Sequence, residues 1–381
     1  MLKSFLKNKP LFYDEIDYTR MPRVYETIKK KLSLPKIIHL IGTNGKGTTG
    51  RFLATALYSL GFKTGHYTSP HIFTLNERIW INGENIDDEL LDSQHQQLLA
   101  LLSKEDSDSL SYFEYTTLLA IYIYKDMDYV ILEAGLGGEF DATAVFENIL
   151  TLVTPIGIDH EAFLGSDIKS IAHTKMNAIK ISAILGLQKY IQVQEVADAL
   201  AQEKNLEILG YKEKLDKNDF DKIEQIAQNN KLEEYLKENL TLAVSALKVL
   251  KIKYEIENFK NSKLYGRLTR LNKNIILDVG HNALAATSIY NSLKESKYTL
   301  VYNSFKDKDY LEILTILKPI INDVEIIEVE DERAESIEEI ATTLKNLEIK
   351  YKNFSLINPD KKYLVFGSFS VAKAFLKVYH E

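Results

Sequence analysis

The hydrophobic pattern of the chain alternates short apolar runs with segments whose apolar positions have helical spacing. Residues 36–42 form a β-branched run, and after a glycine-rich loop residues 48–61 have the spacing of a helix that stops at a glycine. Continuous apolar runs at 128–135 and 149–156 are typical of buried parallel strands, and residues 112–127 predict a crossover helix before them. This order predicts an α/β domain.

A second alternation of strands and helices begins after residue 264. The predicted strands, each followed by a helix of which the first starts near Ala283, are 274–280, 298–304, 323–329 and 361–368. We therefore divide the chain into domains 1–264 and 265–381. The Lys-, Glu- and Asn-rich segment 203–238 predicts solvated helical surface.

The carboxyl ends of the predicted strands indicate where a ligand would bind. Ligands of open α/β sheets bind outside these ends. The loops "GTNGKGT", "EAGLGG", "DVGHN" and "FGS" follow predicted strands. We expect these four loops to face one crevice.

Composition narrows the class of protein. The chain has 381 residues, 45% of them hydrophobic, which is enough for two domains with sizeable cores. A net charge of -7 gives no overall basic field for nucleic acid, and the absence of cysteine excludes disulfides and cysteine metal sites. No apolar run has the length of a membrane span or the form of a signal sequence. The expectation is a cytoplasmic protein without nucleic-acid or membrane partners.

The loop "GTNGKGT" at 42–48 predicts phosphate binding. Three of its residues are glycines, which let the backbone approach an anion at the start of the following helix, and Lys46 adds a positive charge. The common template G-x-x-x-x-G-K-[ST] does not fit, because Leu40 stands at its first glycine and Gly47 separates Lys46 from Thr48. Such glycine clusters also form plain surface turns, but the order strand, loop, lysine and helix favours a nucleotide site.

Glu133 is the clearest candidate for a metal ligand. It ends an apolar strand, where a buried carboxylate is costly unless a cation meets it. Magnesium is the cation that this position favours. An ordinary carboxylate at the edge of the sheet is the alternative.

These motifs resemble one known family. "GTNGKGT" is similar to the ATP loop of the Mur ligase superfamily, and the flanking segments resemble its folate branch, the dihydrofolate synthase/folylpolyglutamate synthases. The resemblance extends over almost the whole chain, through "YTSPHI", "NERIWING", "SYFEYTTLLA", "ILEAGLGGEFDAT", "IGIDHEAFLG", "IAHTKMNAIK", "GRLTRL", "LDVGHN", "KDKD" and "FGSF". It implies a P-loop domain of the Mur ligase central type, followed by a smaller Rossmann-like C-terminal domain that ligates glutamate.

The resemblance also implies a set of ATP-binding and metal-binding residues. The ATP contacts would be Asn44, Gly45, Lys46, Gly47, Thr48, Asn239, Arg267 and Asp278. Two Mg²⁺ ions would be held by Ser69, Glu133, His160 and Lys175, with Lys175 carbamylated to N-carboxylysine. The residues implied to be catalytic are Lys46, Lys175, His160, Glu133 and Arg267. Without the resemblance, Lys175 would be an exposed helix lysine, His160 a loop histidine and Asn239 a helix cap.

The substrate contacts implied by the resemblance form two groups. Phe113, Glu114 and Asp141 would bind the pterin, although Phe113 could equally be a core residue. Arg78, His281 and Ser368 would receive the incoming glutamate, because the planar guanidinium of an arginine can clamp a carboxylate. The chain departs from the family pattern at Glu139, Ala144, Thr174, Met176 and Asn177.

The function predicted from these residues is ATP- and Mg²⁺-dependent ligation of L-glutamate to dihydropteroate, to reduced folates or to both. ATP would convert the carboxylate to an acyl phosphate, the glutamate amine would attack it, and domain closure would assemble the site. A homologue that binds nucleotide but has lost ligase activity is the alternative from another class. A UDP-muramyl peptide synthetase is disfavoured because the ATP loop begins near residue 42, and a P-loop motor because of the second α/β domain. We expect a monomer.

Overall fold

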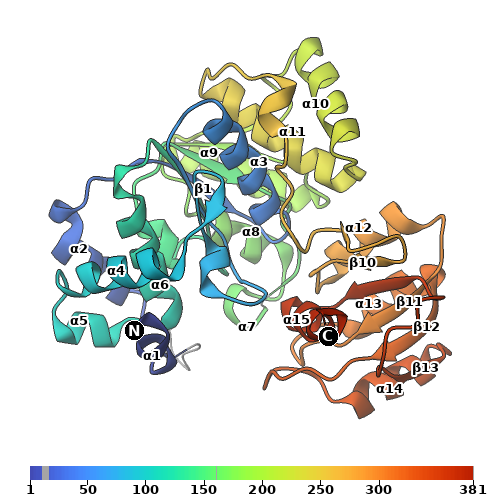
Figure 1. Ribbon diagram of the computed structural model, residues 1–381. Coiled ribbons are helices and arrows are strands. Elements are labelled where there is room, and N and C mark those ends of the chain that lie inside the picture. The colour runs from blue at the N-terminus through green and yellow to red at the C-terminus, as the bar shows by residue number, and fades with distance from the viewer. Residues whose placement is uncertain (11–16, 160, 381) are drawn as a thin grey trace. The chain divides into compact units, whose positions relative to one another are not determined.

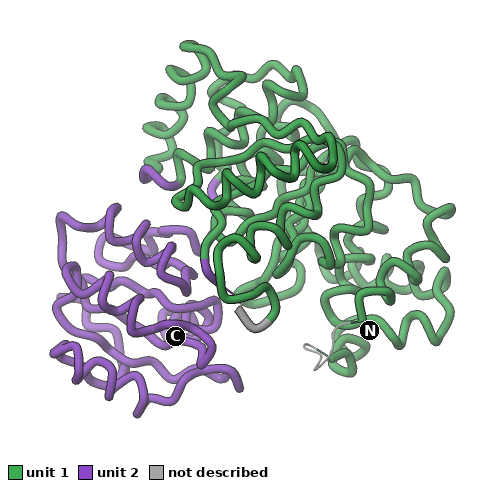
Figure 2. Tube along the Cα trace, turned by 180° about the vertical axis from the view of Figure 1, so that it is seen from behind, with its two compact units in different colours: residues 1–157, 161–232, 236–262 green, residues 158–160, 233–235, 263–381 purple. Residues whose placement is uncertain are grey.

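A computed structural model describes residues 1–10, 17–159 and 161–380. The chain forms two compact units, which have separate colours in Figure 2. Unit 1 comprises residues 1–157, 161–232 and 236–262, and unit 2 comprises residues 158–160, 233–235 and 263–381. Two short segments that precede residue 262 in the chain therefore pack with unit 2.

Unit 1 is built on an eight-stranded sheet in the order β4-β3-β2-β5-β1-β6-β7-β8. Figure 1 labels β1 of this sheet together with helices of the unit. From β2 to β8 neighbouring strands are parallel, whereas β3 and β4 are antiparallel to their neighbours. The strands are β1 (Lys36–Ile41), β2 (Thr64–Tyr67), β3 (Ile79–Ile81), β4 (Glu84–Asn85), β5 (Tyr129–Glu133), β6 (Leu150–Val153), β7 (Ser182–Leu185) and β8 (Glu207–Gly210). The helices are α1 (Leu2–Lys7), α2 (Arg20–Ile28), α3 (Lys46–Ser59), α4 (Asp88–Leu99), α5 (Lys104–Ser109), α6 (Tyr112–Ile123), α7 (Glu161–Leu164), α8 (Ile168–Met176), α9 (Ile191–Lys204), α10 (Lys217–Asn229) and α11 (Glu234–Val249).

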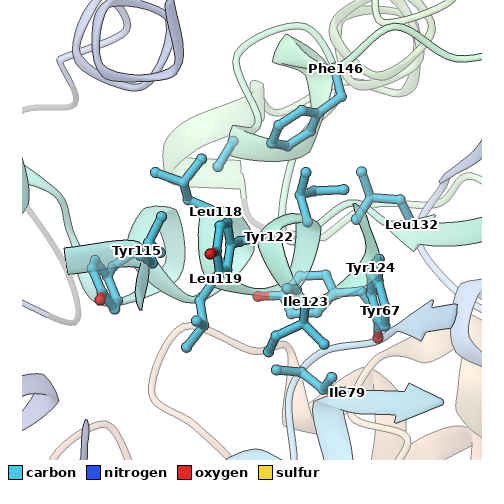
Figure 3. Packing of buried hydrophobic residues seen from close by; sticks show 14 of the residues in the cluster. Tyr67, Ile79, Tyr115, Leu118, Leu119, Tyr122, Ile123, Tyr124, Leu132 and Phe146 are labelled. Carbon is cyan, nitrogen blue, oxygen red and sulfur yellow. The ribbon is translucent and has the colours of Figure 1, made fainter. Parts of the chain in front are cut away.

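Helices bury both faces of this sheet, which explains the continuous apolar runs of the central strands. In β5, Val130 and Leu132 pack with α6, whereas Ile131 packs with α3 and α11 on the other face. Figure 3 shows the α6 side, where side chains of the helix lie among residues from other segments, including Tyr67, Ile79 and Phe146. Packed helices on both faces of the sheet thus hold these strands, and with them their carboxyl ends, in place.

Unit 2 contains a six-stranded sheet in the order β13-β12-β11-β14-β10-β9. All neighbouring pairs are parallel except β9 with β10. The strands are β9 (Thr269–Arg270), β10 (Ile275–Leu277), β11 (Tyr298–Tyr302), β12 (Ile321–Ile326), β13 (Tyr351–Asn353) and β14 (Tyr363–Phe366). The helices are α12 (Ala283–Leu293), α13 (Tyr310–Leu317), α14 (Ile337–Asn346) and α15 (Phe369–His380).

Segment 203–238 contains the expected helical surface as α10, but three details of local structure differ from expectation. Segment 203–238, expected to be helical surface, contains the edge strand β8, and the second domain has an unpredicted edge strand β13. Edge strands have one solvated side, so "EILG" and "YKN" lack the continuous apolar run that marks a central strand. Asn239 does not cap a helix, because α11 begins at Glu234.

In both sheets the order of the strands reverses at one point, known as a topological switch point. In unit 1, β1 lies between β5 and β6, and in unit 2, β14 lies between β11 and β10. Such switch points open a crevice at the carboxyl ends of the strands. The first two of the four predicted loops lie at the switch point of unit 1 and the other two at that of unit 2, while a crevice shared by all four stays a prediction.

Candidate active site

The glycine-rich loop connects β1 to α3 and is tied to the segment after β6. The N–H groups of Thr43 and Asn44 both donate to the carbonyl of Pro155, at 2.9 and 3.2 Å. Gly42 has a φ of +135°, and a Cβ there would lie 2.1 Å from Thr154 Oγ1, so this position requires glycine. The N-cap of α3 is Gly45, which has no side chain that could accept from the first N–H groups of the helix. These N–H groups and the positive end of the helix dipole therefore face the loop. This geometry favours an anion such as a phosphate.

Two side chains of this loop fit a nucleotide with its metal. Lys46 is buried and its Nζ donates to the carbonyls of Gly42 (3.1 Å) and Thr43 (3.3 Å), which holds the ammonium over the loop. The buried Thr48 Oγ1 has no hydrogen-bond partner among the described residues. An unpaired buried hydroxyl costs about 1–3 kcal/mol. Because Mg²⁺ prefers oxygen ligands, this hydroxyl is suited to a cation that accompanies the phosphates.

Glu133 lies at the carboxyl end of β5, opposite Leu40 of β1. Its side chain is buried, with 3% of the residue exposed. Glu133 Oε2 accepts hydrogen bonds from Thr68 Oγ1 and from the N–H of Ser69, the latter at 3.2 Å. The structure therefore brings Ser69 and Glu133 together, because β2 and β5 are neighbours.

Lys175 reaches the same edge of the sheet from α8. The residue is 2% exposed, and its Nζ donates to the carbonyl of Leu136 in the loop after β5 at 2.7 Å. A Cβ on Gly138 would lie 2.1 Å from the Lys175 carbonyl oxygen, so the loop and the helix are in close contact. Lys175 is thus not the exposed helix lysine of the alternative reading.

The predicted metal ligand His160 lies outside the described residues. Among the residues that are described, no group of three or more His, Cys, Asp and Glu side chains is arranged to hold a metal ion. The predicted set contains only two residues of these types, Glu133 and His160, besides a serine and a lysine. The metal site therefore stays a prediction.

Asn239 packs directly against the glycine-rich loop. It is buried in α11, and a Cβ on Gly45 would lie 2.5 Å from its Oδ1. Gly45 itself has a φ of +89° at the N-cap of α3. Asn239 is therefore positioned beside the predicted nucleotide, and the loop could not accept a larger residue at Gly45 without displacing it.

The predicted pterin residues Phe113 and Asp141 both flank Gly135. A Cβ on Gly135 would lie 2.7 Å from the Phe113 ring and 3.3 Å from Asp141 Oδ2. Phe113 is half-buried and lies near Tyr67, with ring centroids 6.2 Å apart. The structure thus places a partly accessible aromatic ring and a carboxylate next to the same glycine, both close to where its Cβ would be.

Glu114 has a structural role in the described structure. Its carboxylate accepts two hydrogen bonds from Arg20, at 2.9 and 3.1 Å, and one from the N–H of Ser111 at 2.7 Å. Ser111 and Glu114 form the capping box of α6. These contacts fix the start of the helix that presents Phe113.

Arg78 lies next to the loop that contains Ser69. Its Nε contacts His71 Nδ1 at 2.9 Å, and its guanidinium lies 5.4 Å from the centre of the Tyr112 ring. The N–H of Thr68 donates to the Arg78 carbonyl at 3.0 Å. The arginine is therefore held at the carboxyl end of β2.

Asp278 of unit 2 organises the loop after β10. It is buried, and it accepts hydrogen bonds from the N–H groups of Leu268 and Gly280, both at 2.8 Å, and from Tyr235 Oη at 3.3 Å. Burial raises the pKa of the carboxyl group, although Arg267 and these hydrogen bonds act in the opposite direction. Arg267, whose guanidinium lies 5.3 Å from the centre of the Phe369 ring, thus belongs to the same loop region.

The predicted glutamate residues of unit 2 follow adjacent strands. Ser368 comes after β14, and its buried Oγ accepts from the N–H of Val371 at the start of α15. His281 comes after β10, and its Nε2 lies 3.6 Å from Asp159 Oδ2. The two loops are joined because the N–H of Gly367 donates to the Gly280 carbonyl at 3.0 Å.

Asp159 is a buried residue whose importance sequence reasoning missed. Its Oδ1 accepts from Lys308 Nζ at 2.6 Å and its Oδ2 from Asn282 Nδ2 at 2.9 Å. The side chains of Asp159 and Lys308 are only 4% and 6% exposed. The motifs "IGIDHEAFLG" and "KDKD" drew attention to both positions, but nothing in their spacing shows that the two charges meet.

Comparison with known proteins identifies the family. No protein-family model matches the chain. The dihydrofolate synthase/folylpolyglutamate synthase of Buchnera aphidicola subsp. Acyrthosiphon pisum is 32% identical over 409 residues, with 96% of each chain covered. The chain belongs to the dihydrofolate synthase/folylpolyglutamate synthase family. The protein of this name from Escherichia coli K12 is 31% identical over 364 residues, covering 90% of this chain and 85% of the relative.

Solved structures confirm the predicted fold class for this family member. Helicobacter pylori folylpolyglutamate synthetase matches with a TM-score of 0.80 and 38% identity, covering 100% of this chain and 98% of the other. E. coli FolC in complex with DHPP and ADP matches with a TM-score of 0.82 and 26% identity over 99% and 96% of the two chains. A bifunctional folylpolyglutamate synthase/dihydrofolate synthase with Mn, AMPPNP and L-glutamate bound gives 0.82 and 25% over 100% and 97%.

Three of the five departures from the family pattern, Glu139, Thr174 and Asn177, contact one another. Asn177 Nδ2 donates to Glu139 Oε2 at 2.9 Å, and the N–H of Glu139 donates to the Thr174 carbonyl at 3.0 Å. Lys204 Nζ donates to Asn177 Oδ1 at 2.8 Å. These contacts therefore connect the loop after β5 to the C-terminal end of α8, next to Lys175.

Helix lengths and hydropathy bear on the expectation that this family member has no membrane partner. Within the described ranges, no helix is long and apolar enough to cross a bilayer.

Proposed function

We propose that this protein is an ATP-dependent ligase that joins L-glutamate to dihydropteroate, to reduced folates or to both. The observation that carries the proposal is the carboxyl edge of β1 and β5, where the lysine-bearing loop lies beside the buried carboxylate of Glu133. Relatives are named dihydrofolate synthase/folylpolyglutamate synthase, and related structures hold ADP, DHPP or L-glutamate. Residues 1–264 would bind ATP, and residues 265–381 would serve glutamate ligation.

The reaction activates a carboxylate that is otherwise a poor electrophile. A carboxylate oxygen of the pteroyl or folyl substrate attacks the γ-phosphorus of ATP, which forms an acyl phosphate and releases ADP. The amine of glutamate then attacks the acyl carbon, and the resulting tetrahedral intermediate expels phosphate and loses a proton to give the amide. Lys46 and the N-terminus of α3 would hold the triphosphate, with Arg267 on the phosphates and Asp278 on the ribose.

The described residues fit a divalent metal that accompanies ATP. The orphaned Thr48 hydroxyl, the buried carboxylate of Glu133 and the neighbouring Ser69 all offer oxygen ligands, the type that Mg²⁺ prefers. His160 would complete the set. Bound Mg²⁺ would supply positive charge to the phosphates. The loop residues and Glu133 are held in place by their own hydrogen bonds and so require little rearrangement.

We propose that Lys175 carries a carbamate. The ammonium would first lose a proton; the neutral amine would then attack carbon dioxide, forming a C–N bond as one C=O π bond opens and releasing a second proton, so that a cation becomes an anion. The carbamate nitrogen keeps one N–H, which can maintain the hydrogen bond to the Leu136 carbonyl. The burial of Lys175 at the carboxyl edge of the sheet supports this role, because an ammonium there would add positive charge beside the proposed metal ions, whereas a carbamate would add negative charge.

The substrate contacts follow from the geometry on each unit. The half-buried Phe113 ring would stack on the pterin, and Asp141 would accept hydrogen bonds from the amino-pyrimidine edge. Arg78 would clamp a carboxylate of the incoming glutamate, assisted by His281 and Ser368. The protein would act as a cytoplasmic monomer on small molecules, without nucleic-acid or membrane partners.

Phosphate release tests the proposed function. Purified protein with ATP and Mg²⁺ is offered dihydropteroate or tetrahydrofolate, each with and without L-glutamate. Release that requires both glutamate and a pteroyl substrate supports the ligase. A protein that binds ATP but shows no glutamate-dependent release with either substrate would instead be a nucleotide-binding homologue without ligase activity.

A further inference from the structure

A chain of buried hydrogen bonds runs from β1 to the carboxylate proposed to bind the pterin. His39 Nε2 lies 2.8 Å from Thr143 Oγ1, and Thr143 Oγ1 donates to Asp141 Oδ1 at 2.6 Å. His39 and Thr143 are each 1% exposed, whereas Asp141 is half-buried. The chain therefore connects a fully buried ring to a carboxylate that solvent can reach.

The direction of these hydrogen bonds follows from the number of protons available. A carboxylate can only accept, so the single hydroxyl proton of Thr143 points to Asp141. Thr143 Oγ1 must then accept from His39, which places the histidine proton on Nε2. His39 Nδ1 is buried and has no hydrogen-bond partner within the described part of the chain, and an unprotonated nitrogen is the less costly atom to leave there.

The charge state of His39 agrees with this arrangement. Burial lowers the pKa of His39 to about 4, against a smaller opposing effect of Asp141. The ring is therefore neutral near neutral pH and has a single N–H to donate. The geometry thus fixes a polar chain whose only charge is the carboxylate at its outer end.

Two further hydrogen bonds complete the orientation of Asp141. Its Oδ1 also accepts from the N–H of Thr143 at 3.0 Å, and its Oδ2 accepts from the N–H of Leu136 at 3.2 Å. The Leu136 carbonyl in turn accepts from Lys175. Asp141 is therefore held by donors from three directions rather than by its own rotamer preference.

We propose that His39 and Thr143 are positioning residues for the pteroyl substrate, which orient Asp141 toward the amino-pyrimidine edge. The inference rests on the proposed function and adds two residues to it. Because His39 belongs to β1, which ends at the glycine-rich loop, one strand supports both the ATP loop and the pterin carboxylate. Removing the Thr143 hydroxyl loses a hydrogen bond to the charged carboxylate, and removing His39 loses the donor that fixes the direction of the Thr143 hydroxyl.

Steady-state kinetics of the full chain test the proposal. Thr143→Val and His39→Leu each remove a donor, and we expect each to raise the KM for dihydropteroate about tenfold while the KM values for ATP and glutamate change less than about twofold. Thr143→Ser and His39→Gln keep a hydroxyl or an N–H at the same place and should restore the KM.

Thr299→Val is the matched control. Thr299 is also buried and also donates its hydroxyl to an aspartate at 2.6 Å, but its partner is Asp323 of unit 2. It should lower thermal stability to a similar extent and leave the KM for dihydropteroate unchanged. If a general loss of packing were the cause, the KM for dihydropteroate would rise in Thr299→Val as it does in Thr143→Val.

The outcomes separate the two proposals. Wild-type protein without any pteroyl-dependent phosphate release would overturn the proposed function itself. Active wild type together with an unchanged dihydropteroate KM in folded Thr143→Val and His39→Leu would overturn only the positioning role. If either variant fails to fold, Thr143→Ser and Thr143→Ala replace it. A KM for dihydropteroate that equals the wild-type value in Thr143→Ser and is raised in Thr143→Ala supports the positioning role. Equal KM values in the two variants would overturn it.

Discussion

The segment around Asp159 comes from the first half of the chain but packs with unit 2. We expect its buried ion pair with Lys308 to be the main polar contact that holds it there. The Lys308→Met variant removes the ammonium and leaves the Asp159 carboxylate with Asn282 at 2.9 Å and His281 at 3.6 Å among its neighbours. Breaking a buried pair costs about 3–5 kcal/mol, and the remaining amide contact places this variant near the lower end, about 3 kcal/mol.

The opposite variant, Asp159→Asn, should cost less. It leaves the buried ammonium of Lys308 with the carboxylate of Asp307 at 2.9 Å, which is 55% exposed and can partly replace the lost charge. We expect the double variant to be more stable than the sum of the single effects by about 1–2 kcal/mol, because neither charge is then left unpaired.

The assay must report on unit 2 separately from unit 1. Hydrogen exchange of peptides that cover α12 and β11 measures the local free energy of opening in unit 2. The single tryptophan, Trp80, lies in β3 of unit 1 and monitors that unit by fluorescence in the same samples. Unchanged protection of both peptides in Lys308→Met, or strictly additive effects in the double variant, would refute this role of the ion pair.

The dependence of stability on pH in the alkaline range provides an independent test of the Lys308–Asp159 ion pair. Burial lowers the pKa of Lys308, but attraction and hydrogen bonding to Asp159 and Asp307 outweigh it, so that the pKa is raised above 10.5. The stabilisation from a lysine with a raised folded-state pKa is fully present below 10.5 and is lost as pH rises through the folded pKa. The stability difference between wild type and Lys308→Met should therefore shrink above about pH 10.5.

Three further predictions concern unit 1. Lys46→Ala should lower kcat about 10²–10³-fold with the fold intact, as measured by phosphate release and circular dichroism, because it removes a charge from the site of the triphosphate; retention of full kcat would contradict the assignment. Wild-type activity should fall in buffer depleted of carbon dioxide and recover with bicarbonate, whereas Lys175→Ala should be insensitive, and bicarbonate-independent wild-type activity would exclude the carbamate. Glu114→Gln should destabilise the protein by about 3 kcal/mol in urea unfolding, since Arg20 then lacks its buried carboxylate, and a dihydropteroate KM that rises without loss of stability would instead indicate direct contact with substrate.

The sequence predicted the central elements of both sheets because those strands are buried on both faces. β1, β5 and β6 appear as runs dominated by apolar residues for this reason, and the order of motifs along the chain was sufficient to indicate the family. The edge strands β8 and β13 were missed because no residue of either strand is fully buried, and all three residues of β13 are exposed, so neither has the apolar run of a central strand.

The site was predictable where a charge had to stand at the end of an apolar strand, as Glu133 does. It was not predictable where the partner comes from a distant part of the chain. Lys308 and Asp159 are far apart in sequence, and the pairing of Glu114 with Arg20 likewise depends on how α2 packs beside α6. Ser111 and Glu114 have the spacing of a capping box, but that spacing does not show that the same carboxylate binds an arginine.

The buried polar groups of this protein share one arrangement that explains why they can be kept at a catalytic edge. Glu133, Asp141 and Asp278 each accept N–H groups from their own or a neighbouring loop. Such donors offset part of the hydration that a carboxylate loses on burial. Asp159 differs because Lys308 neutralises it directly. This contrast supports the proposal that Asp159 holds the chain together and that the other three carboxylates serve the substrates and the metal.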